Sequence, residues 1–269
     1  MASSPAIVRF SPAFSLPEKG SSQTMAIDRM APAQRPQGYS VMRQRWAELL
    51  FLHWQADPQQ LQRLLPPGLE IDTYDGAAYV GLVPFTMTGI RPTILPPFPP
   101  LSNFHEINVR TYVHRQGRDP GVWFFSLDAA NSVAVRLARA LFRLPYYFAR
   151  MSLNATPERT QYTSQRLWSP PLPAECDISY TPMGSIEPAQ RDTLDHFLCE
   201  RYFLYAYARG QLYRGQVHHA PYPLQSAVLH HCRENLIAAA GITCLDTPPL
   251  IHFAREVRVQ IFPLKRSEK

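Results

Sequence analysis

The sequence predicts one β-rich α+β domain with a few short helices. Most segments between residues 43 and 262 are short and aromatic-rich, or alternate polar with apolar side chains, which is typical of strands. A few stretches have helical spacing, and no internal repeat or flexible linker divides the chain. We therefore expect a disordered or loosely ordered leader over residues 1–40 and a single domain over residues 41–269.

The first structured segments are a strand and a capped helix. The strand is WAELLFLHWQA (Trp46 to Ala56), which is apolar enough to be buried. The helix follows in DPQQLQRLLPPG, where Asp57 suits the N-cap, Pro58 suits the first helical position and Pro-Pro-Gly ends the helix. The next segment predicts a hairpin about Asp75-Gly76, because a two-residue Asp-Gly turn matches the twist of paired strands.

Further strands and two more helices follow a proline-rich loop. We expect strands over residues 103–113 and 122–129, and a helix over Asn131 to Phe142, whose apolar residues have helical spacing. Another helix is expected over Arg191 to Arg201, capped by Asp192 or Thr193. A hairpin at Arg209-Gly210 and a closing strand over Phe253 to Phe262 complete the sheet.

Composition limits the classes of partner. The formal net charge is +6, but the basic residues are scattered arginines with acids between them, and no nucleic-acid motif is present. No apolar run approaches the roughly 20 residues that a membrane helix needs. We therefore expect neither nucleic acid nor a membrane as partner, and the sequence leaves the oligomeric state open, homo-oligomers included.

The four cysteines predict a reducing compartment. They show neither paired nor metal-finger spacing, and the N-terminus has no secretory signal pattern. We expect free thiols and a cytoplasmic protein.

Familiar catalytic motifs are absent. The sequence contains no glycine-rich nucleotide loop, no GxSxG and no HExxH. The pairs His218-His219 and His230-His231 do not predict a metal site, because adjacent strand residues point to opposite faces and each pair can offer one ligand. We expect no metal and no cofactor.

The segment NFHEINVRTYV carries the polar residues of greatest interest. In a strand, Glu106, Asn108, Arg110 and Tyr112 share one face, and apolar side chains with Thr111 share the other. Glu106 and Arg110 would lie roughly 13 Å apart at the backbone, too far for direct pairing, so a buried row would need intermediates such as Asn108 or a polar ligand. On spacing alone a solvent face is favoured, because antiparallel sheets commonly keep one wet face.

Several blocks together resemble a known family. In order they are LLFLHW, LLPPGLEIDTYDGAAYVGLVPF, FHEINVRTYV, GVWFFSLDA, LPYYFARM, ERYFLYA and VHHAPYPLQ, spanning about residues 43–262. They resemble the YqjF-like family of uncharacterised conserved proteins, which is distantly similar to acetoacetate decarboxylase. The resemblance implies a β-cone or barrel around an internal pocket, with a few flanking helices. It also implies that Glu106, Asn108 and Arg110 face that pocket.

The sequence departs from acetoacetate decarboxylase at the residue that the decarboxylase mechanism needs. Acetoacetate decarboxylase uses a lysine Schiff base, and tyrosines stand at the similar place here, in Leu144-Pro145-Tyr146-Tyr147. No lysine occurs between Lys19 and Lys265. Imine chemistry in the pocket is therefore not expected.

Two functional hypotheses remain, and the sequence leaves catalysis open. In the first, the pocket binds a small polar or anionic metabolite such as an oxo acid: Arg110 binds an oxygen, Glu106 is the acid or base, and Asn108 orients it. Weaker candidates for the walls are Tyr112, Tyr146, Arg201 and His219. In the second, the protein is a non-catalytic ligand-binding or structural module, and the row is a satisfied buried network that fixes strand register.

Overall fold

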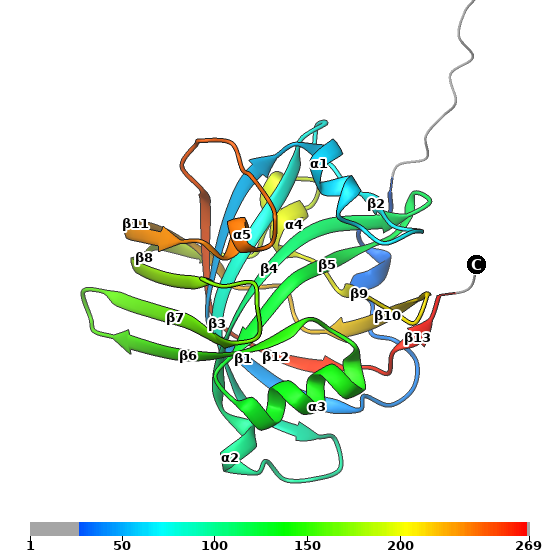
Figure 1. Ribbon diagram of the computed structural model, residues 1–269, viewed down its shortest axis with the longest axis horizontal. Helices are drawn as coiled ribbons and strands as arrows, with labels where there is room; N and C mark the ends of the chain where they lie inside the picture. The colour runs from blue at the N-terminus through cyan, green and yellow to red at the C-terminus, as the bar shows by residue number, and fades with distance from the viewer. Residues whose placement is uncertain (1–26, 268–269) are drawn as a thin grey trace, which may run out of the picture.

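The computed structural model describes residues 27–267, and its fold is one sheet with short helices at its ends (Figure 1). The strands are β1 (Met42–Ala56), β2 (Glu70–Ile71), β3 (Ala78–Pro92), β4 (Phe104–Arg115), β5 (Arg118–Ala129), β6 (Tyr146–Ala155), β7 (Thr160–Trp168), β8 (Glu175–Glu187), β9 (Phe203–Ala208), β10 (Gln211–His218), β11 (Leu224–Glu234), β12 (Leu250–Ile261) and β13 (Lys265–Arg266). The helices are the 3₁₀ turn η1 (Ala31–Ala33), α1 (Pro58–Arg63), α2 (Pro99–Ser102), α3 (Ser132–Phe142), α4 (Leu194–Cys199) and α5 (Leu236–Ala239).

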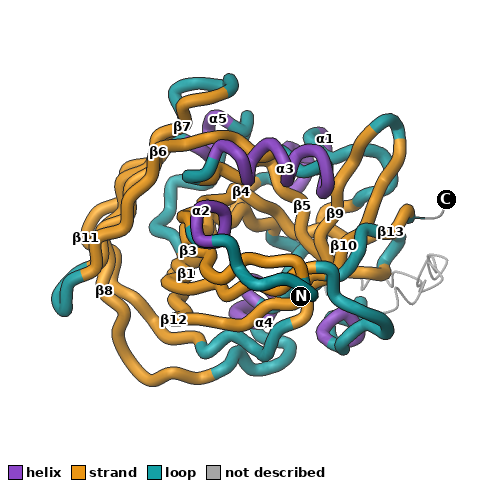
Figure 2. Tube along the Cα trace, turned by 90° about the horizontal axis from the view of Figure 1, so that it is seen from below, coloured by secondary structure: helices purple, strands orange, loops and turns teal. Residues whose placement is uncertain are grey.

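Strand pairing runs round the molecule in two closed circuits. Neighbours pair in the order β13-β10-β9-β5-β6-β7-β8-β11-β12-β1-β3-β4-β2, and the additional pairings β10–β12 and β5–β4 join strands that are not adjacent in this order. One circuit is β12-β1-β3-β4-β5-β9-β10, and the other passes through β6, β7, β8 and β11. Both share β12, β1, β3, β4 and β5. Figure 2 shows β6, β7, β8 and β11 on one side of this shared wall and β9, β10 and β13 on the other.

Each side of the shared wall has its own apolar core. Ile107 and Val109 of β4 pack with Tyr162 and Tyr180 of the β6–β8 side. Tyr112 of β4, of the opposite parity, packs with Phe197 and Val217 on the β9–β10 side, and near the end of the strand Val113 packs there with Tyr205 of β9. Because β4 lies between two cores, its residues 106–113 are buried on both faces. The solvent face favoured by spacing alone is therefore wrong, and the inward orientation implied by the family resemblance is confirmed.

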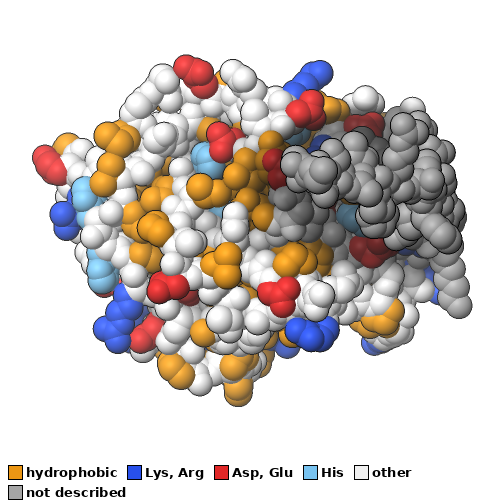
Figure 3. Space-filling view, turned by 90° about the horizontal axis from the view of Figure 1, so that it is seen from above, with side chains coloured by type: hydrophobic (Ala, Val, Ile, Leu, Met, Phe, Trp, Pro, Cys, Tyr) orange, Lys and Arg blue, Asp and Glu red, His pale blue; other side chains and the backbone are white. Residues whose placement is uncertain are grey.

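Two helices, α4 and α3, lie at the two ends of the β9–β10 side, whereas α1 and α5 pack against the other core. Buried α4 packs into the core of the β9–β10 side and lies at the upper end in Figure 1, whereas α3 lies across the lower end with α2 beneath it. Figure 3 shows the molecule from above: on the part that grey atoms do not cover, apolar patches lie among acidic side chains, and basic side chains lie mainly toward the edge. None of the helices described between residues 27 and 267 is long and apolar enough to cross a membrane.

Most expected elements form, with local differences. Asp57 caps α1 through a hydrogen bond from Gln59 N at 2.9 Å, and the helix expected from Asn131 is α3, capped by Asn131. The Asp75-Gly76 turn forms, but the expected hairpin is reduced to a single bridge between Tyr74 and Ala77. The strand before the turn, β2, pairs with β4 and not with β3. α4 is shorter than expected and is capped by Thr193.

The first part of the chain contacts the domain where it is described. Pro32 of η1 is buried, and Arg29 forms an ion pair with Asp72 at 2.5 Å. The expectation of a leader over residues 1–40 falls mainly on residues 1–26, which lie outside the described part of the chain.

Candidate functional site

A cavity of about 110 Å³ lies on the β9–β10 side of the shared wall. Its polar lining comes from Glu106, Asn108 and Arg110 of β4, Tyr146 of β6 and Gln44 of β1. The remaining lining is apolar or aromatic: Trp46, Leu49, Phe51, Val83, Phe85, Met87, Phe124, Leu127, Phe142, Leu144, Leu204, Val217, Tyr222 and Ile261. Four of the seven residues expected at the site therefore meet in one cavity.

Strand geometry explains which side chains reach the cavity. Period-two alternation directs Glu106, Asn108 and Arg110 to the same side of β4, and all three are buried. In β1 a bulge at Glu48, whose φ is 53°, shifts the pairing register with β3. The bulge lets both Trp46 and Leu49 line the cavity, although their sequence positions differ in parity.

Glu106 is a carboxyl group whose burial favours the neutral form. The Tyr146 hydroxyl donates a hydrogen bond to Glu106 Oε2 at 3.0 Å. Burial raises the pKa of Glu106 from 4.5 to about 8, the nearby Asp128 charge adds to this shift, and hydrogen bonds from Tyr146 and Asn108 oppose it. At neutral pH Glu106 therefore holds a proton that it can donate or transfer.

Arg110 is a buried cation without a carboxylate partner. Its Nη2 donates to the main-chain carbonyl of Leu198 in α4 at 3.1 Å, and its guanidinium lies 5.5 Å from the ring centre of Phe51. Its Nε has no hydrogen-bond partner, and no carboxylate between residues 27 and 267 forms an ion pair with it. The Oδ1 atom of Asn108, between Arg110 and Glu106 on the strand, is also unpartnered. The cavity therefore presents both an unpaired cation and an unused acceptor.

Tyr112 and Arg201 lie beyond the cavity, at the end that α4 closes. The Tyr112 hydroxyl donates to the Leu198 carbonyl at 2.6 Å and lies 2.7 Å from His53 Nε2. Arg201 pairs with Asp72 at 2.8 Å. Both side chains are held by protein groups and hold α4 in place, and neither lines the cavity.

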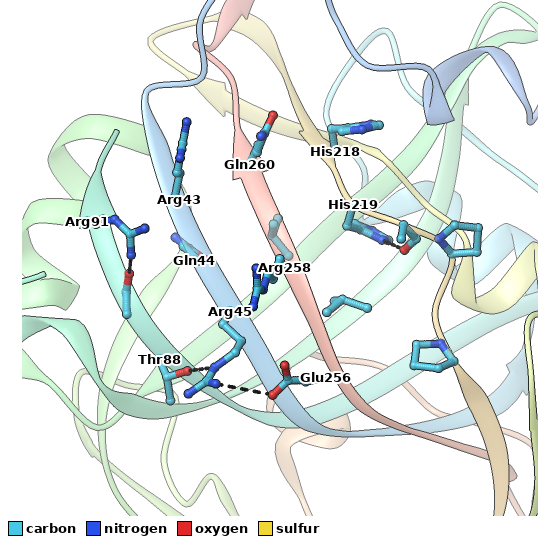
Figure 4. A pocket seen from close by; sticks show the side chains of 16 residues that line it. Arg43, Gln44, Arg45, Thr88, Arg91, His218, His219, Glu256, Arg258 and Gln260 are labelled. Atoms are coloured by element: carbon cyan, nitrogen blue, oxygen red, sulfur yellow. Dashed lines mark hydrogen bonds and ion pairs between the residues drawn. The ribbon is translucent and has the colours of Figure 1, made fainter. Parts of the chain in front are cut away.

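His219 belongs to a different hollow on the outside of the sheet. This open groove of about 970 Å³ lies over β1, β12 and β3, and Figure 4 shows its arginines on adjacent strands. They are Arg43, Arg45, Arg91 and Arg258; among them Arg45 pairs with Glu256 at 3.6 Å. The His219 ring stacks on Tyr202, and burial lowers the pKa of His219 to about 4. His219 is therefore neutral and packed at neutral pH.

Sequence reasoning missed a buried ion pair next to the cavity. Asp128 of β5 accepts two hydrogen bonds from Arg166 of β7, at 2.7 and 2.8 Å, and the guanidinium lies 3.8 Å from the ring centre of Tyr147. Asp128 also contributes to the raised pKa of Glu106. The signal was present, since Asp128 is a lone carboxylate in the apolar segment VWFFSLDA.

No metal centre is formed by the described side chains. Within residues 27–267, no three His, Cys, Asp or Glu residues gather closely enough to hold an ion. The four cysteines are free thiols.

Comparison with known proteins places the chain among uncharacterised relatives with a known fold. The model of the DUF2071 family, described as an uncharacterised conserved protein, matches residues 43–258. The uncharacterised protein YqjF of Bacillus subtilis is 39% identical over 231 residues, covering 86% of this chain and 94% of YqjF.

Solved structures show the fold. The enduracididine biosynthesis enzyme MppR, complexed with pyruvate, matches with a TM-score of 0.57 at 14% identity, covering 87% of this chain and 93% of MppR. An acetoacetate decarboxylase-like enzyme from Sphingomonas wittichii matches with a TM-score of 0.58 at 13% identity, covering 87% and 96%. The acetoacetate-decarboxylase-like fold expected from the sequence is thereby confirmed.

Proposed function

The chain belongs to the DUF2071 family of uncharacterised conserved proteins, and we propose that it binds a small organic acid in the inner cavity. The observation that carries this proposal is the unpaired guanidinium of Arg110. A buried charge without a partner costs several kcal/mol, by the rough measure of ion desolvation. A ligand carboxylate at Arg110 would offset that cost, and the planar guanidinium suits a carboxylate geometrically.

The size of the cavity limits the bound part of the ligand. Its volume of about 110 Å³ corresponds to roughly four water molecules at about 30 Å³ each. A carboxylate with an adjacent carbonyl group is of this order. The pyruvate bound to MppR, which has the same fold, supports an oxo acid as the class of ligand.

The cavity also supplies a proton donor for the second oxygen of such a ligand. Glu106 is neutral at neutral pH because burial raises its pKa to about 8, so it can donate a hydrogen bond to a carbonyl oxygen. Proton transfer from Glu106 would favour enol formation, isomerisation or hydration at that carbonyl. A Schiff base is excluded, because the chain has no lysine between Lys19 and Lys265.

The alternative, a satisfied structural network, has less support. A network that only fixes strand register would pair its polar atoms within the protein. Arg110 Nε and Asn108 Oδ1 are instead unpartnered among the described groups. Arg201 also has an unpartnered Nη2, but it faces the Asp72 carboxylate, whereas no described carboxylate pairs with Arg110. We further propose a cytoplasmic location, which the four free thiols support.

The test is ligand binding by wild type and two arginine variants. Calorimetry with pyruvate and other short 2-oxo and simple carboxylic acids should show binding to wild type and to Arg258→Met, an exposed control in the outer groove. Arg110→Met should lose it. Equal binding by Arg110→Met, or no binding of any of these acids to wild type at millimolar concentration, would contradict the proposal.

A further inference from the structure

A second hollow of about 630 Å³ lies between α2, α3 and the ends of β1 and β3. Its lining is mostly apolar, and its polar members are Gln44, Arg91, Ser102 and Tyr146. Arg91, its one charged side chain, donates a hydrogen bond to the Gly89 carbonyl at 3.3 Å. We call this hollow the α3 groove.

The α3 groove adjoins the inner cavity. Gln44, Met87, Phe142 and Tyr146 line both spaces. Tyr146 lies at the boundary of the two spaces, and its hydroxyl donates a hydrogen bond to Glu106 inside the cavity. Met87, an unbranched and flexible side chain, lies at this boundary. The groove and the cavity therefore meet at these four side chains.

The described residues, 27–267, cover the apolar face of α3 only in part. Of its residues only Val135 is buried, while Leu137 and Leu141 are 49% and 66% exposed. Leu95 and Phe98, in the loop before α2 and at its N-cap, are also exposed and line the same groove. Exposed apolar side chains that gather in one hollow indicate a binding surface, whereas scattered ones need no explanation.

We infer that the α3 groove holds the apolar tail of the ligand whose carboxylate is bound by Arg110. This inference rests on the proposed function of the cavity. The cavity has room for the carboxylate and carbonyl only, and the groove adds several times that volume with almost no polar lining. A single molecule that fills both has a charged head and an uncharged chain. The substrate class is therefore a 2-oxo acid with an extended aliphatic or aromatic substituent.

The first experiment is a chain-length series. Calorimetry with unbranched 2-oxo acids from pyruvate to 2-oxooctanoate should give affinities that rise about threefold to fourfold for each methylene group that enters the groove. Arg110→Met should weaken every member of the series, because all of them place a carboxylate at the same site.

The second experiment changes the groove without touching the cavity. Leu137→Gln and Leu141→Gln should lower the gain per methylene and leave pyruvate affinity unchanged. Both side chains are about half exposed or more, so the variants should fold. Val133→Gln is the matched control: Val133 lies on the same helix and is 47% exposed, but it does not line the groove.

The outcomes separate the two claims. Pyruvate binding that depends on Arg110 but affinity that does not change with chain length overturns this inference and leaves the proposed function standing. Absence of binding for every acid overturns both. Light scattering adds one more test: if Leu141→Gln dissociates an oligomer of the wild type without changing the chain-length series, the groove is an interface between copies of this chain and the inference is wrong.

Discussion

Arg201, at the end closed by α4, and Arg110, in the cavity, are both buried, but the groups around them differ. Arg201 faces Asp72 at 2.8 Å, and the third buried arginine, Arg166, faces Asp128 at 2.7 Å. Arg110 has a main-chain carbonyl and aromatic rings in place of a carboxylate. Among the buried arginines of residues 27–267, the fold therefore neutralises Arg166 and Arg201 internally and leaves Arg110 beside the cavity. We interpret this difference as the distinction between a structural and a ligand-binding arginine.

Removing a structural carboxylate should have the largest effect. Asp128→Ala leaves Arg166 buried without its partner, and we expect the free energy of unfolding to fall by about 3–5 kcal/mol. Urea denaturation followed by circular dichroism measures the change. The double variant Asp128→Leu with Arg166→Met should recover most of the loss, because no unpaired charge remains. If Asp128→Ala lost less than about 1 kcal/mol, the usual value for an exposed ion pair, Arg166 would not differ from Arg110 as a structural arginine.

Replacing Arg110, the arginine of the cavity, should not lower the free energy of unfolding but should abolish stabilisation by the ligand. Without ligand, Arg110→Met should keep or increase the free energy of unfolding, because an apolar side chain of similar length replaces an unpaired charge. With a ligand at a hundred times its dissociation constant, wild type should gain about 2.7 kcal/mol and the variant nothing. Thermal unfolding with and without pyruvate measures both effects. A loss as large as that of Asp128→Ala would show that Arg110 is structural.

Sequence reasoning predicted the row of residues but not its surroundings. The period of two placed Glu106, Asn108 and Arg110 on one face correctly. That face is buried because the shared wall lies between two cores, and the pairings that bring the two sides around it, such as β12–β1 and β5–β9, join strands far apart in the chain. The solvent face favoured by spacing was wrong for this reason, and only the family resemblance supplied the inward orientation.

The partners of the buried charged residues could not be predicted from the sequence either. Asp72 and Arg201 are separated by 129 residues, and Asp128 and Arg166 by 38. No local pattern shows that these two arginines meet carboxylates or that Arg110 does not. Tyr112 continues the row in sequence, yet α4 covers the end of the strand at that point and its Leu198 carbonyl accepts the Tyr112 hydrogen bond. The position of α4 therefore divides one polar row into a cavity part and a structural part.

The pH dependence of stability tests the neutral state of Glu106. Its pKa is raised from 4.5 to about 8 by burial, so the folded protein holds a proton that the unfolded chain releases between these values. Wild-type stability should therefore fall with rising pH across this window, by at most about 1.4 kcal/mol per pH unit from this group.

Glu106→Gln isolates that contribution, because glutamine can still accept the Tyr146 hydrogen bond and does not titrate. The difference in unfolding free energy between variant and wild type should grow in favour of the variant from pH 5 to pH 8 and then become constant. Subtraction removes the titration of the buried histidines common to both proteins. A difference that is flat with pH would mean that Glu106 is ionised in the cavity and would remove it as a proton donor.

The smallest effect on stability is expected for Arg29, which shares the Asp72 carboxylate with Arg201. Arg29 and Arg201 bind the two oxygens of Asp72, but the Arg29 side chain is 27% exposed and the Arg201 side chain is buried. Arg29→Met should therefore cost about 0.2–1 kcal/mol, in the range of an exposed pair, because Asp72 keeps Arg201. Urea denaturation at low and high salt measures it, and the loss should shrink at high salt. A loss of several kcal/mol would mean that Asp72 needs Arg29 as well as Arg201. Pairing with one carboxylate would then no longer be what makes Arg201 structural and Arg110 ligand-binding.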